Sequence, residues 1–493
     1  MHYRIEMKPT LNNLVKGIIS ANGDVPATPI KNIQLHSSNV KPGDLYIAVY
    51  GTQADGHDFI PEALENGASA IITNERDVGS LPVPQVKVSN PRKAASFVAA
   101  EYYGHPSKEL HIVGITGTNG KTSTATIITS ILNKAGCKTA QLGTLGVIAK
   151  QHEQGKTLTT MDAINLQKLL RDLADDDFSH VVMEVSSHAI HQYRVADVEF
   201  DTTVFTNLTP EHLDYHGTME DYYHAKAKLF KSLPLSATAI INSNDEYGKR
   251  LITESTAPVI KVSVTNNSDV HFKEIHSSLR GISGIIVAGE HEINFNSELI
   301  GDFNQENILC AVGSALAMGI PLGTIAEGIN DCKVVTGRME TFTAPNGAPI
   351  VVDYAHTPDA YEKALNTIYN LVPENGRLIT IFGCGGNRDA SNRPIMGRLV
   401  EQYSDYFYIT PDNPRFEKQE DIIQEILGGL SSDHYDIYDN RGAAILNALN
   451  DLNSNDVLVI LGKGRETYQE IEGVRHPYSD IEIIEEFCAH NAN

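Results

Sequence analysis

The chain has 493 residues, of which 41% are apolar and 20% charged, a composition typical of a globular protein with roughly two to four domains. Acidic residues outnumber basic ones by 62 to 39, and the net charge of −23 argues against nucleic acid and anionic membranes as partners. No apolar stretch approaches the roughly 20 residues that span a bilayer, no secretory signal is visible, and the 5 cysteines lack paired spacing. We therefore expect a cytoplasmic protein with no membrane insertion and no nucleic-acid partner.

The first predicted domain, residues 1–107, is a small α/β domain. Two strand-like runs, GDLYIAVYG at 43–51 and ASAIITN at 68–74, flank a helical pattern. The second, residues 108–336, has strands at 111–116, 180–185, 201–208 and 237–243 separated by helical patterns, which predicts a mainly parallel sheet. The alternating stretch at 282–295 predicts antiparallel strands.

The third predicted domain, residues 337–493, is Rossmann-like. Its strand-then-loop units are IVVDYAHTP, RLITIFGCGG, YFYITPDNP and VLVILGKG, and helical patterns separate them. In each unit the polar residues follow the strand. Because ligands of open parallel sheets bind at the carboxyl ends of the strands, we expect a ligand site there.

A phosphate-binding loop is predicted at GITGTNGKTS, between the strand at 111–116 and a helix. Its backbone amides could surround phosphate oxygens, Lys121 could offset their charge, and the Thr122 hydroxyl could bind magnesium. The segment departs from the usual phosphate-loop pattern, because five residues separate Gly114 from Gly120 instead of four. Ile115 therefore occupies the position of the first glycine. The alternative is a glycine turn that only tightens the junction of strand and helix.

Acidic and histidine residues follow the next two strands. Glu184 ends an apolar strand, where a carboxylate is costly unless it meets a cation. TNLTPEHLDYHG then supplies His212, Asp214 and His216, with the two histidines one helical turn apart if the segment is helical. These residues are candidate metal ligands, and the alternative is a structural histidine pair.

Six segments carry a resemblance to one enzyme family and occur in that family's order: TGTNGKTS, MEVSSHAI, TNLTPEHLDYHGTMEDYYHAKAKLF, GDFNQEN, DYAHTPD and DNPR. With these segments the chain resembles the Mur ligases, which are ATP-dependent amide-forming enzymes of peptidoglycan synthesis. The resemblance is closest to the MurE type, which joins a diamino acid to the D-glutamate of UDP-N-acetylmuramoyl-L-alanyl-D-glutamate. It implies a first domain that binds the UDP end of the substrate, a central ATPase domain, and a third domain that moves over ATP and binds the amino acid. It also implies Mg²⁺ and an acyl-phosphate intermediate.

The resemblance assigns roles by matching motifs. ATP-binding residues would be Gly117, Thr118, Asn119, Gly120, Lys121, Thr122, Ser123, Asn304, Arg338, Asp353 and His356. Metal ligands would be Thr122, Glu184, His212 and Lys226, with Lys121, Lys226 and His212 as the catalytic set. UDP-substrate contacts would be Ser37, Thr159, Thr160, Ser186 and Arg194. Amino-acid contacts would be Arg388, Asp412, Asn413, Pro414, Arg415, Gly462 and Glu466. For Arg338 and Asp353 the alternative is an interdomain ion pair.

Lys226 matches a lysine that is carbamylated in the family, a change that turns a cation into an oxygen ligand for a second magnesium. Without the resemblance it reads as a surface lysine on a helix. Lys228, two residues on, would face another side of that helix.

Arg415 bears on the choice of amino acid. meso-Diaminopimelate has a second carboxylate that lysine lacks, and a guanidinium fork suits it. Lysine would leave that guanidinium unpaired, and in the family DNPR marks the diaminopimelate-adding enzymes. Glu466 would meet the far ammonium group. The alternatives are a solvated loop arginine and a lysine-adding enzyme.

Two other classes compete with this interpretation. Folylpolyglutamate synthetase shares the chemistry, but the complete first domain and DNPR argue against it. A P-loop switch protein would not need a second domain with amino-acid-binding loops. The chain departs from the family at the uridine end, where His36, Ser37 and Ser38 replace Asp-Ser-Arg.

Overall fold

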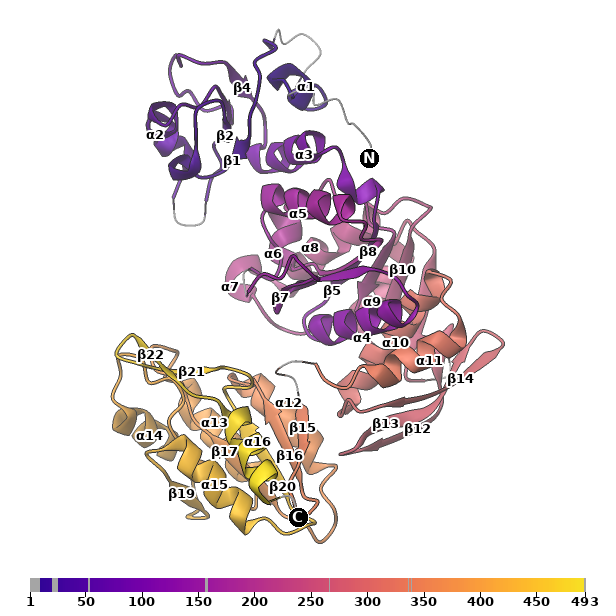
Figure 1. The fold of residues 1–493 in the computed structure, drawn as a ribbon, viewed down its shortest axis with the longest axis vertical. Helices are drawn as coiled ribbons and strands as arrows, with labels where there is room; N and C mark the ends of the chain where they lie inside the picture. Colours follow the sequence, from indigo (N-terminus) through magenta and orange to yellow (C-terminus); the bar gives the residue numbers. More distant parts are fainter. Residues whose placement is uncertain are drawn as a thin grey trace. The chain divides into compact units, whose positions relative to one another are not determined.

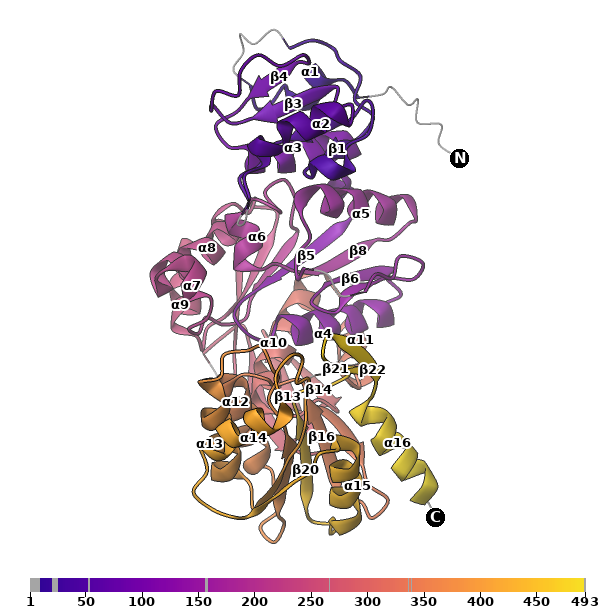
Figure 2. The same ribbon diagram turned by 90° about the vertical axis from the view of Figure 1, so that its left-hand side faces the viewer.

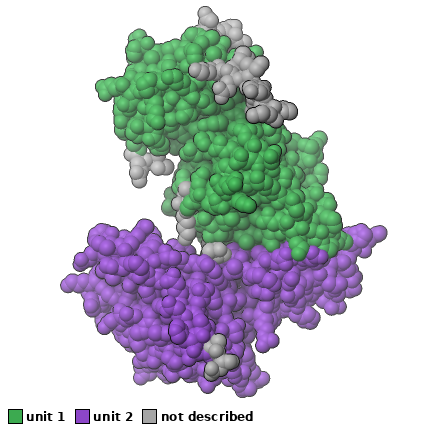
Figure 3. All heavy atoms as spheres, in the orientation of Figure 1, with its two compact units in different colours: residues 1–270, 309–325 green, residues 271–308, 326–493 purple. Residues whose placement is uncertain are grey.

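The computed structural model describes residues 9–19, 25–51, 54–155, 158–265, 267–335, 337 and 339–491. The chain divides into two compact units, coloured separately in Figure 3: residues 1–270 with 309–325, and residues 271–308 with 326–493. Among the helices formed by the described residues, none has the length and apolarity that crossing a membrane requires.

The first unit begins with a four-stranded parallel sheet in the order β1-β2-β3-β4. Its strands are β1 (Ile33–Gln34), β2 (Leu45–Ile47), β3 (Ala70–Thr73) and β4 (Gln85–Lys87), with helices α2 (Ile60–Glu65) and α3 (Pro91–Tyr103). The Asn90 side chain caps the start of α3, and left-handed Gly104 ends it. The strands and the helix between them confirm the pattern expected for this segment.

A larger sheet of the first unit contains β5 at its centre. In the order β11-β10-β9-β5-β8-β6-β7 all neighbours are parallel except β6 and β7, which confirms the mainly parallel sheet. The strands are β5 (His111–Thr116), β6 (Thr139–Gly143), β7 (Gly146–Ile148), β8 (His180–Glu184), β9 (Thr202–Phe205), β10 (Thr238–Asn242) and β11 (Val259–Ser263). The loops that leave β5, β8 and β9 therefore meet at one edge.

Helices cover both faces of this sheet, with α4 on one side and α5 and α8 on the other (Figures 1 and 2). The helices are α4 (Lys121–Lys134), α5 (Ala163–Asp175), α6 (Ser187–His191), α7 (Leu213–His216), α8 (Met219–Lys231) and α9 (Glu246–Glu254). Helix α4 is rich in β-branched residues, which have weak helix propensity. It forms because Ile127, Ile128 and Ile131 are buried on one face, and tertiary packing outweighs propensity.

The second unit contains an antiparallel pair, β13 (Gly281–Ala288) and β14 (His291–Ser297), as the alternating stretch predicted. Its main sheet has the order β15-β16-β20-β17-β18-β19, parallel except for β15. These strands are β15 (Glu340–Thr343), β16 (Pro349–Asp353), β17 (Leu378–Phe382), β18 (Tyr406–Ile409), β19 (Tyr435–Ile437) and β20 (Val457–Leu461).

Two apolar layers cover this second sheet. Side chains of α12 (Pro358–Tyr369), α13 (Asn392–Tyr403) and α14 (Gln419–Leu427) form one, and side chains of α15 (Arg441–Asp451) and α16 (Asp480–Asn491) form the other. The sheet is thus doubly wound, as a Rossmann-like domain requires. A hairpin, β21 (Tyr468–Ile471) with β22 (Val474–Pro477), follows β20.

Candidate active site

The predicted phosphate loop lies between β5 and α4. Gly117 has φ +154°, and a Cβ on it would lie 1.9 Å from the Thr206 hydroxyl oxygen, so a side chain is excluded there. Gly120 adopts the left-handed conformation directly before α4. The Lys121 ammonium folds back over the loop and donates to the carbonyls of Gly117 at 2.9 Å and Thr118 at 2.7 Å. A glycine-containing loop with one cation over it, directly before a helix, is the arrangement of an anion-binding loop.

The end of β9 holds this loop in place. Asn119 donates its backbone N–H to the Asn207 side chain at 3.0 Å, and Thr118 donates its own to the Asn207 carbonyl at 2.9 Å. The Thr206 hydroxyl donates to the Asn119 carbonyl at 2.6 Å. Because β5 and β9 are adjacent, residues about 90 positions apart fix the loop's shape.

Glu184 ends β8 with its carboxylate buried against the first turn of α4. It accepts from the Thr122 hydroxyl at 2.9 Å and from the Thr144 backbone N–H and hydroxyl at 2.9 and 3.0 Å. A Cβ at Gly143 would come within 2.2 Å of this carboxylate. Neither Gly143 nor Thr144 belongs to a recognisable motif; the short LGTLG segment after a strand is the only sequence signal there.

Lys226 is buried in the middle of α8, with a residue exposure of 1%. The interpretation as a surface lysine is therefore wrong, whereas Lys228 is exposed, as expected for another side of the helix. The Lys226 ammonium donates to the Gly117 carbonyl at 2.9 Å, the same oxygen that Lys121 uses. Burial, and secondarily the Lys121 cation, hold the pKa of Lys226 well below its usual value.

His212 precedes α7 in a left-handed conformation, with φ +55°. Its ring packs edge-on against His188 at 4.8 Å between centroids, and its Nε2 lies 3.8 Å from the Glu211 carboxylate. The His216 ring also lies near His188, at 5.6 Å between centroids, and its Nε2 contacts the Ser187 hydroxyl at 2.9 Å. Burial, then the neighbouring His188, lower the pKa of His216 to about 4, so it is neutral near pH 7. Among the described contacts, none joins His212 to Glu184 or Lys226.

Four of the predicted UDP-substrate residues form one hydrogen-bonded chain beside Glu184. The Thr160 hydroxyl donates to the Glu184 carbonyl at 2.9 Å and lies 3.4 Å from the Ser186 hydroxyl. Arg194 donates to the Thr160 carbonyl at 2.8 Å. The Thr159 hydroxyl lies 3.3 Å from that of Thr144.

Ser37 lies in a short turn between β1 and β2 of the four-stranded sheet. Its hydroxyl donates to the Glu62 carboxylate at 2.6 Å. The contacts of the described residues do not join it to Thr160 or Arg194. The neighbouring positions His36 and Ser38 that depart from the family pattern lie in the same turn.

The nucleotide residues predicted in the second unit have internal partners. Asn304 is buried in α10 (Asp302–Ala317) and donates to the Ile300 carbonyl at 2.8 Å. Asp353 accepts the N–H groups of Met339 and Ala355, both at 2.7 Å. His356 is exposed and its Nδ1 lies 2.9 Å from the Tyr354 carbonyl. Arg338 lies outside the described residues.

The loops after β17, β18 and β20 enclose a pocket of about 360 Å³ at the carboxyl edge of the second sheet. It gathers six predicted residues from separate loops, as expected from the topology: Arg388, Asp412, Asn413, Arg415, Gly462 and Glu466. His356 also lines it, while Pro414 does not. Gly462 has φ +113°, and a Cβ there would lie 2.5 Å from the Asp412 carboxylate.

Arg415 is held rigidly at the pocket wall. It has a left-handed backbone, φ +53°, which is strained for a residue with a side chain. Two backbone hydrogen bonds to the β21 segment, from Arg415 to Glu470 at 3.0 Å and from Glu472 to Arg415 at 2.6 Å, stabilise it. Its guanidinium donates to the Gly386 carbonyl at 2.7 Å.

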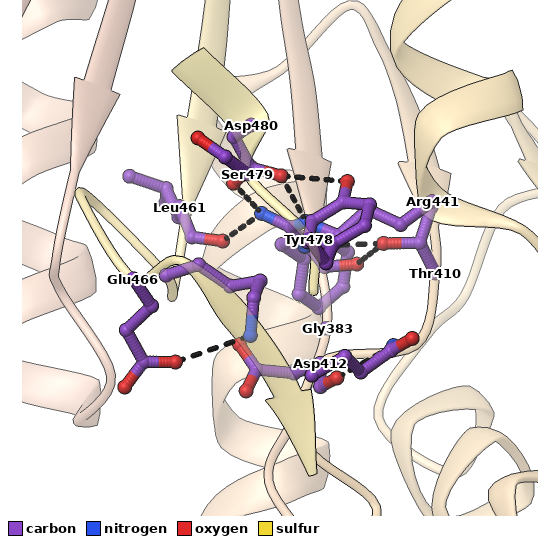
Figure 4. Close-up of polar contacts among 12 residues, drawn as sticks. Gly383, Thr410, Asp412, Arg441, Leu461, Glu466, Tyr478, Ser479 and Asp480 are labelled. Atoms are coloured by element: carbon purple, nitrogen blue, oxygen red, sulfur yellow. Dashed lines mark hydrogen bonds and ion pairs between the residues drawn. The ribbon is translucent and has the colours of Figure 1, made fainter. Parts of the chain in front are cut away.

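A buried ion pair joins the strands that carry this pocket (Figure 4). Arg441 donates to both carboxylate oxygens of Asp480 at 2.9 and 2.8 Å, to the Thr410 hydroxyl at 3.1 Å, and to the Leu461 carbonyl at 2.9 Å. Thr410 follows β18 and Leu461 ends β20. The pair therefore fixes the spacing of the two loops, a role that no sequence motif indicated.

Magnesium fits the first unit in part. The Thr122 hydroxyl and the Glu184 carboxylate are 2.9 Å apart and offer the oxygen ligands that Mg²⁺ prefers, and phosphate and water would supply the others. Within the described residues, no group of three or more His, Cys, Asp or Glu side chains is arranged to hold a metal. Lys226 as an amine does not fit a metal; it would do so only as a carbamate.

Three family models match successive parts of the chain: the Mur ligase family catalytic domain at residues 29–103, the Mur ligase middle domain at 115–315, and the Mur ligase glutamate ligase domain at 337–464. The chain belongs to the Mur ligase family.

Several similar proteins share one name. UDP-N-acetylmuramoyl-L-alanyl-D-glutamate–2,6-diaminopimelate ligase of Aquifex aeolicus is 42% identical over 93% of this chain and 93% of its own length. The Pseudomonas aeruginosa protein of that name is 40% identical over 93% of this chain and 95% of its own. A solved structure of a ligase of that name superposes with a TM-score of 0.75 at 30% identity, covering 99% of this chain and 100% of its own.

Folylpolyglutamate synthase of Mycobacterium tuberculosis, solved with ADP, shares the fold with a TM-score of 0.60 at 15% identity. It covers 76% of this chain and 92% of its own length.

Proposed function

We propose that the chain is an ATP-dependent ligase that joins meso-diaminopimelate to the D-glutamate of UDP-N-acetylmuramoyl-L-alanyl-D-glutamate, releasing ADP and phosphate. The observation that carries this proposal is the pocket of the second unit, which places Arg388 and Arg415 in one cavity with Glu466. Cations for carboxylates and an anion for an ammonium group suit a diamino acid with two carboxylates. Relatives 40–42% identical carry the name of this activity.

The reaction begins when an oxygen of the D-glutamyl side-chain carboxylate attacks the terminal phosphorus of ATP, forming an acyl phosphate and ADP. The unprotonated amine of the amino acid then attacks the acyl carbon. The tetrahedral intermediate collapses to an amide, and inorganic phosphate leaves with the oxygen that began on the carboxylate. The protein's contribution is to position three reactants and to offset the negative charge of ATP and the UDP-substrate.

Residues of the first unit would supply that offset. Lys121 would transfer its hydrogen bonds from loop carbonyls to phosphate oxygens, and residues 117–123 would bind the phosphates, with the amides of Thr118 and Asn119 held by Asn207. Thr122 and Glu184 would hold Mg²⁺, whose chemistry is to neutralise charge on the phosphates. We assign His212 and a carbamylated Lys226 to a second Mg²⁺.

Other residues would position the substrates. Thr159, Thr160, Ser186 and Arg194 would bind the UDP-substrate, since they are linked beside Glu184. Ser37 would contact the uridine end. Asn304, Arg338, Asp353 and His356 would contact the nucleotide, and Asp412, Asn413, Pro414 and Gly462 would complete the amino-acid loops. We also propose the domain boundaries 1–107, 108–336 and 337–493, and a cytoplasmic location, where ATP is available and the free cysteines stay reduced.

A phosphate-release assay with purified protein tests the function. Release should require ATP, the UDP-muramoyl dipeptide and meso-diaminopimelate together, and folate with glutamate should not replace them. A UDP-substrate labelled with ¹⁸O in the D-glutamyl side-chain carboxylate should yield labelled phosphate. Release without the amino acid, or unlabelled phosphate during turnover, would contradict the proposed reaction.

Arg415→Ala should reduce kcat/KM for meso-diaminopimelate by roughly 30- to 150-fold. The loss corresponds to about 2–3 kcal/mol, the range for a hydrogen-bonded charged pair. L-Lysine has no second carboxylate for this guanidinium. We therefore expect kcat/KM for lysine to be much lower than for diaminopimelate and to change little in Arg415→Ala. Steady-state rates with each amino acid measure the difference.

Arg398→Ala is the matched control, because Arg398 is an exposed arginine of α13 outside the pocket. Its kinetics should equal those of the unmodified protein. Equal losses with lysine and diaminopimelate in Arg415→Ala would show that Arg415 does not select between them.

A further inference from the structure

Lys463 is a completely buried lysine in the loop after β20, with an exposure of 0%. Its ammonium donates to the Asn413 side-chain oxygen at 3.1 Å and to Glu466 Oε2 at 3.1 Å. A buried cation is costly unless it is paired and hydrogen-bonded. Its position is therefore determined by these two partners.

Both partners of Lys463 line the proposed amino-acid pocket, and they come from loops after different strands. Asn413 also donates from its amide nitrogen to Glu466 Oε2 at 2.8 Å, which closes a triangle of three side chains. The Tyr354 hydroxyl donates to the other oxygen, Oε1, at 3.4 Å. Oε2 is thus committed to Lys463 and Asn413, and Oε1 is the oxygen better placed for a ligand.

Asp412 adds a buried carboxylate near the partly buried Glu466 (Figure 4). Burial raises the pKa of Asp412; the Lys463 cation is the foremost influence that lowers it, followed by Arg441, whereas Glu466 raises it. Arg441 is already engaged by both oxygens of Asp480. Lys463 is therefore the main cation that offsets the charge of Asp412, in addition to its hydrogen bond to Glu466.

We propose that Lys463 is a positioning residue of the amino-acid pocket: it joins Asn413 to Glu466 and holds the Glu466 carboxylate so that Oε1 binds an ammonium group of the incoming diamino acid. This inference rests on the proposed function, because that function defines the ligand. A lysine with a merely structural role would stabilise the fold without affecting the affinity for one substrate.

Lys463→Met keeps the length of the side chain and removes its charge. We expect KM for meso-diaminopimelate to rise about 10- to 100-fold, as when one partner of a buried charge pair is truncated. KM for ATP and for the UDP-substrate should stay within about twofold.

A double-mutant cycle with Glu466→Gln separates positioning from structure. In the Glu466→Gln background, Lys463→Met should raise KM for diaminopimelate by at most about threefold, because the charge that Lys463 holds is gone. Full additivity, or equal increases in all three KM values, would overturn the inference. If Lys463→Met alone does not fold, the double variant, which also removes the charge of Glu466, is compared with Glu466→Gln by the same criterion.

Arg465→Met is the control, because Arg465 stands in the same loop but pairs with Glu340 and does not line the pocket. Its KM for diaminopimelate should be unchanged. A wild-type protein that never uses diaminopimelate would refute the proposed function itself. A wild-type protein that uses it, with an unchanged KM in Lys463→Met, would refute only the role of Lys463.

Discussion

Lys121→Ala should lower kcat for phosphate release by at least about 10²- to 10³-fold while leaving the fold intact. Removing one preorganised donor from a charged transition state typically costs that much. The two hydrogen bonds that Lys121 makes to loop carbonyls at 2.9 and 2.7 Å are local, so the free energy of unfolding should change by about 1 kcal/mol or less. Steady-state kinetics and denaturant unfolding measure the two quantities.

Lys134→Ala is the control for this variant, because Lys134 is an exposed lysine in the last turn of the same helix. It should retain the wild-type rate. An undiminished rate in Lys121→Ala would refute the phosphate-loop assignment.

Lys121→Ala should also raise the pKa of Lys226 toward its ordinary value, because the Lys121 cation is one cause of the lowered pKa of Lys226.

Lys226→Ala should lower kcat by about 10²-fold or more, and acetate or formate should restore part of the rate. A carbamate forms when a neutral amine adds carbon dioxide and releases a proton. Burial and the nearby Lys121 cation lower the pKa of Lys226 and so favour its neutral amine, and the carbamate, an anion, would be attracted by Lys121. As the pH falls through the lowered pKa of Lys226, the amine takes up a proton, so carbamate and activity should decline together.

Rescue is measured as the initial rate of phosphate release against the concentration of added carboxylate. Lys228→Ala, which removes an exposed lysine from the same helix, should need no rescue. Wild-type protein equilibrated with ¹³C-labelled carbon dioxide should show a carbamate carbon by NMR that Lys226→Ala lacks. A plain amine at high carbon dioxide in the wild-type protein would refute the carbamate.

The local elements of this protein follow from its sequence, because they depend on patterns within a few residues. The strand at 111–116, the glycine loop and the helix from Lys121 follow from an apolar run, residues that allow unusual backbone angles, and a buried isoleucine face. The order of strands and helices likewise predicted two α/β sheets and placed the loops at 383–388, 412–415 and 462–466 at one edge.

Only the tertiary structure decided which charges are buried and what they meet. Lys226 and Lys121 share the Gly117 carbonyl, although Lys226 lies 109 residues from it in the chain. Lys463 likewise meets Asn413 across a separation of 50 residues. A lysine in a helix or loop pattern is usually solvated, and its burial depends on the packing of distant elements and on a partner that offsets the cost of desolvation. That information is carried by contacts between strands that are distant in sequence, so no local pattern contains it.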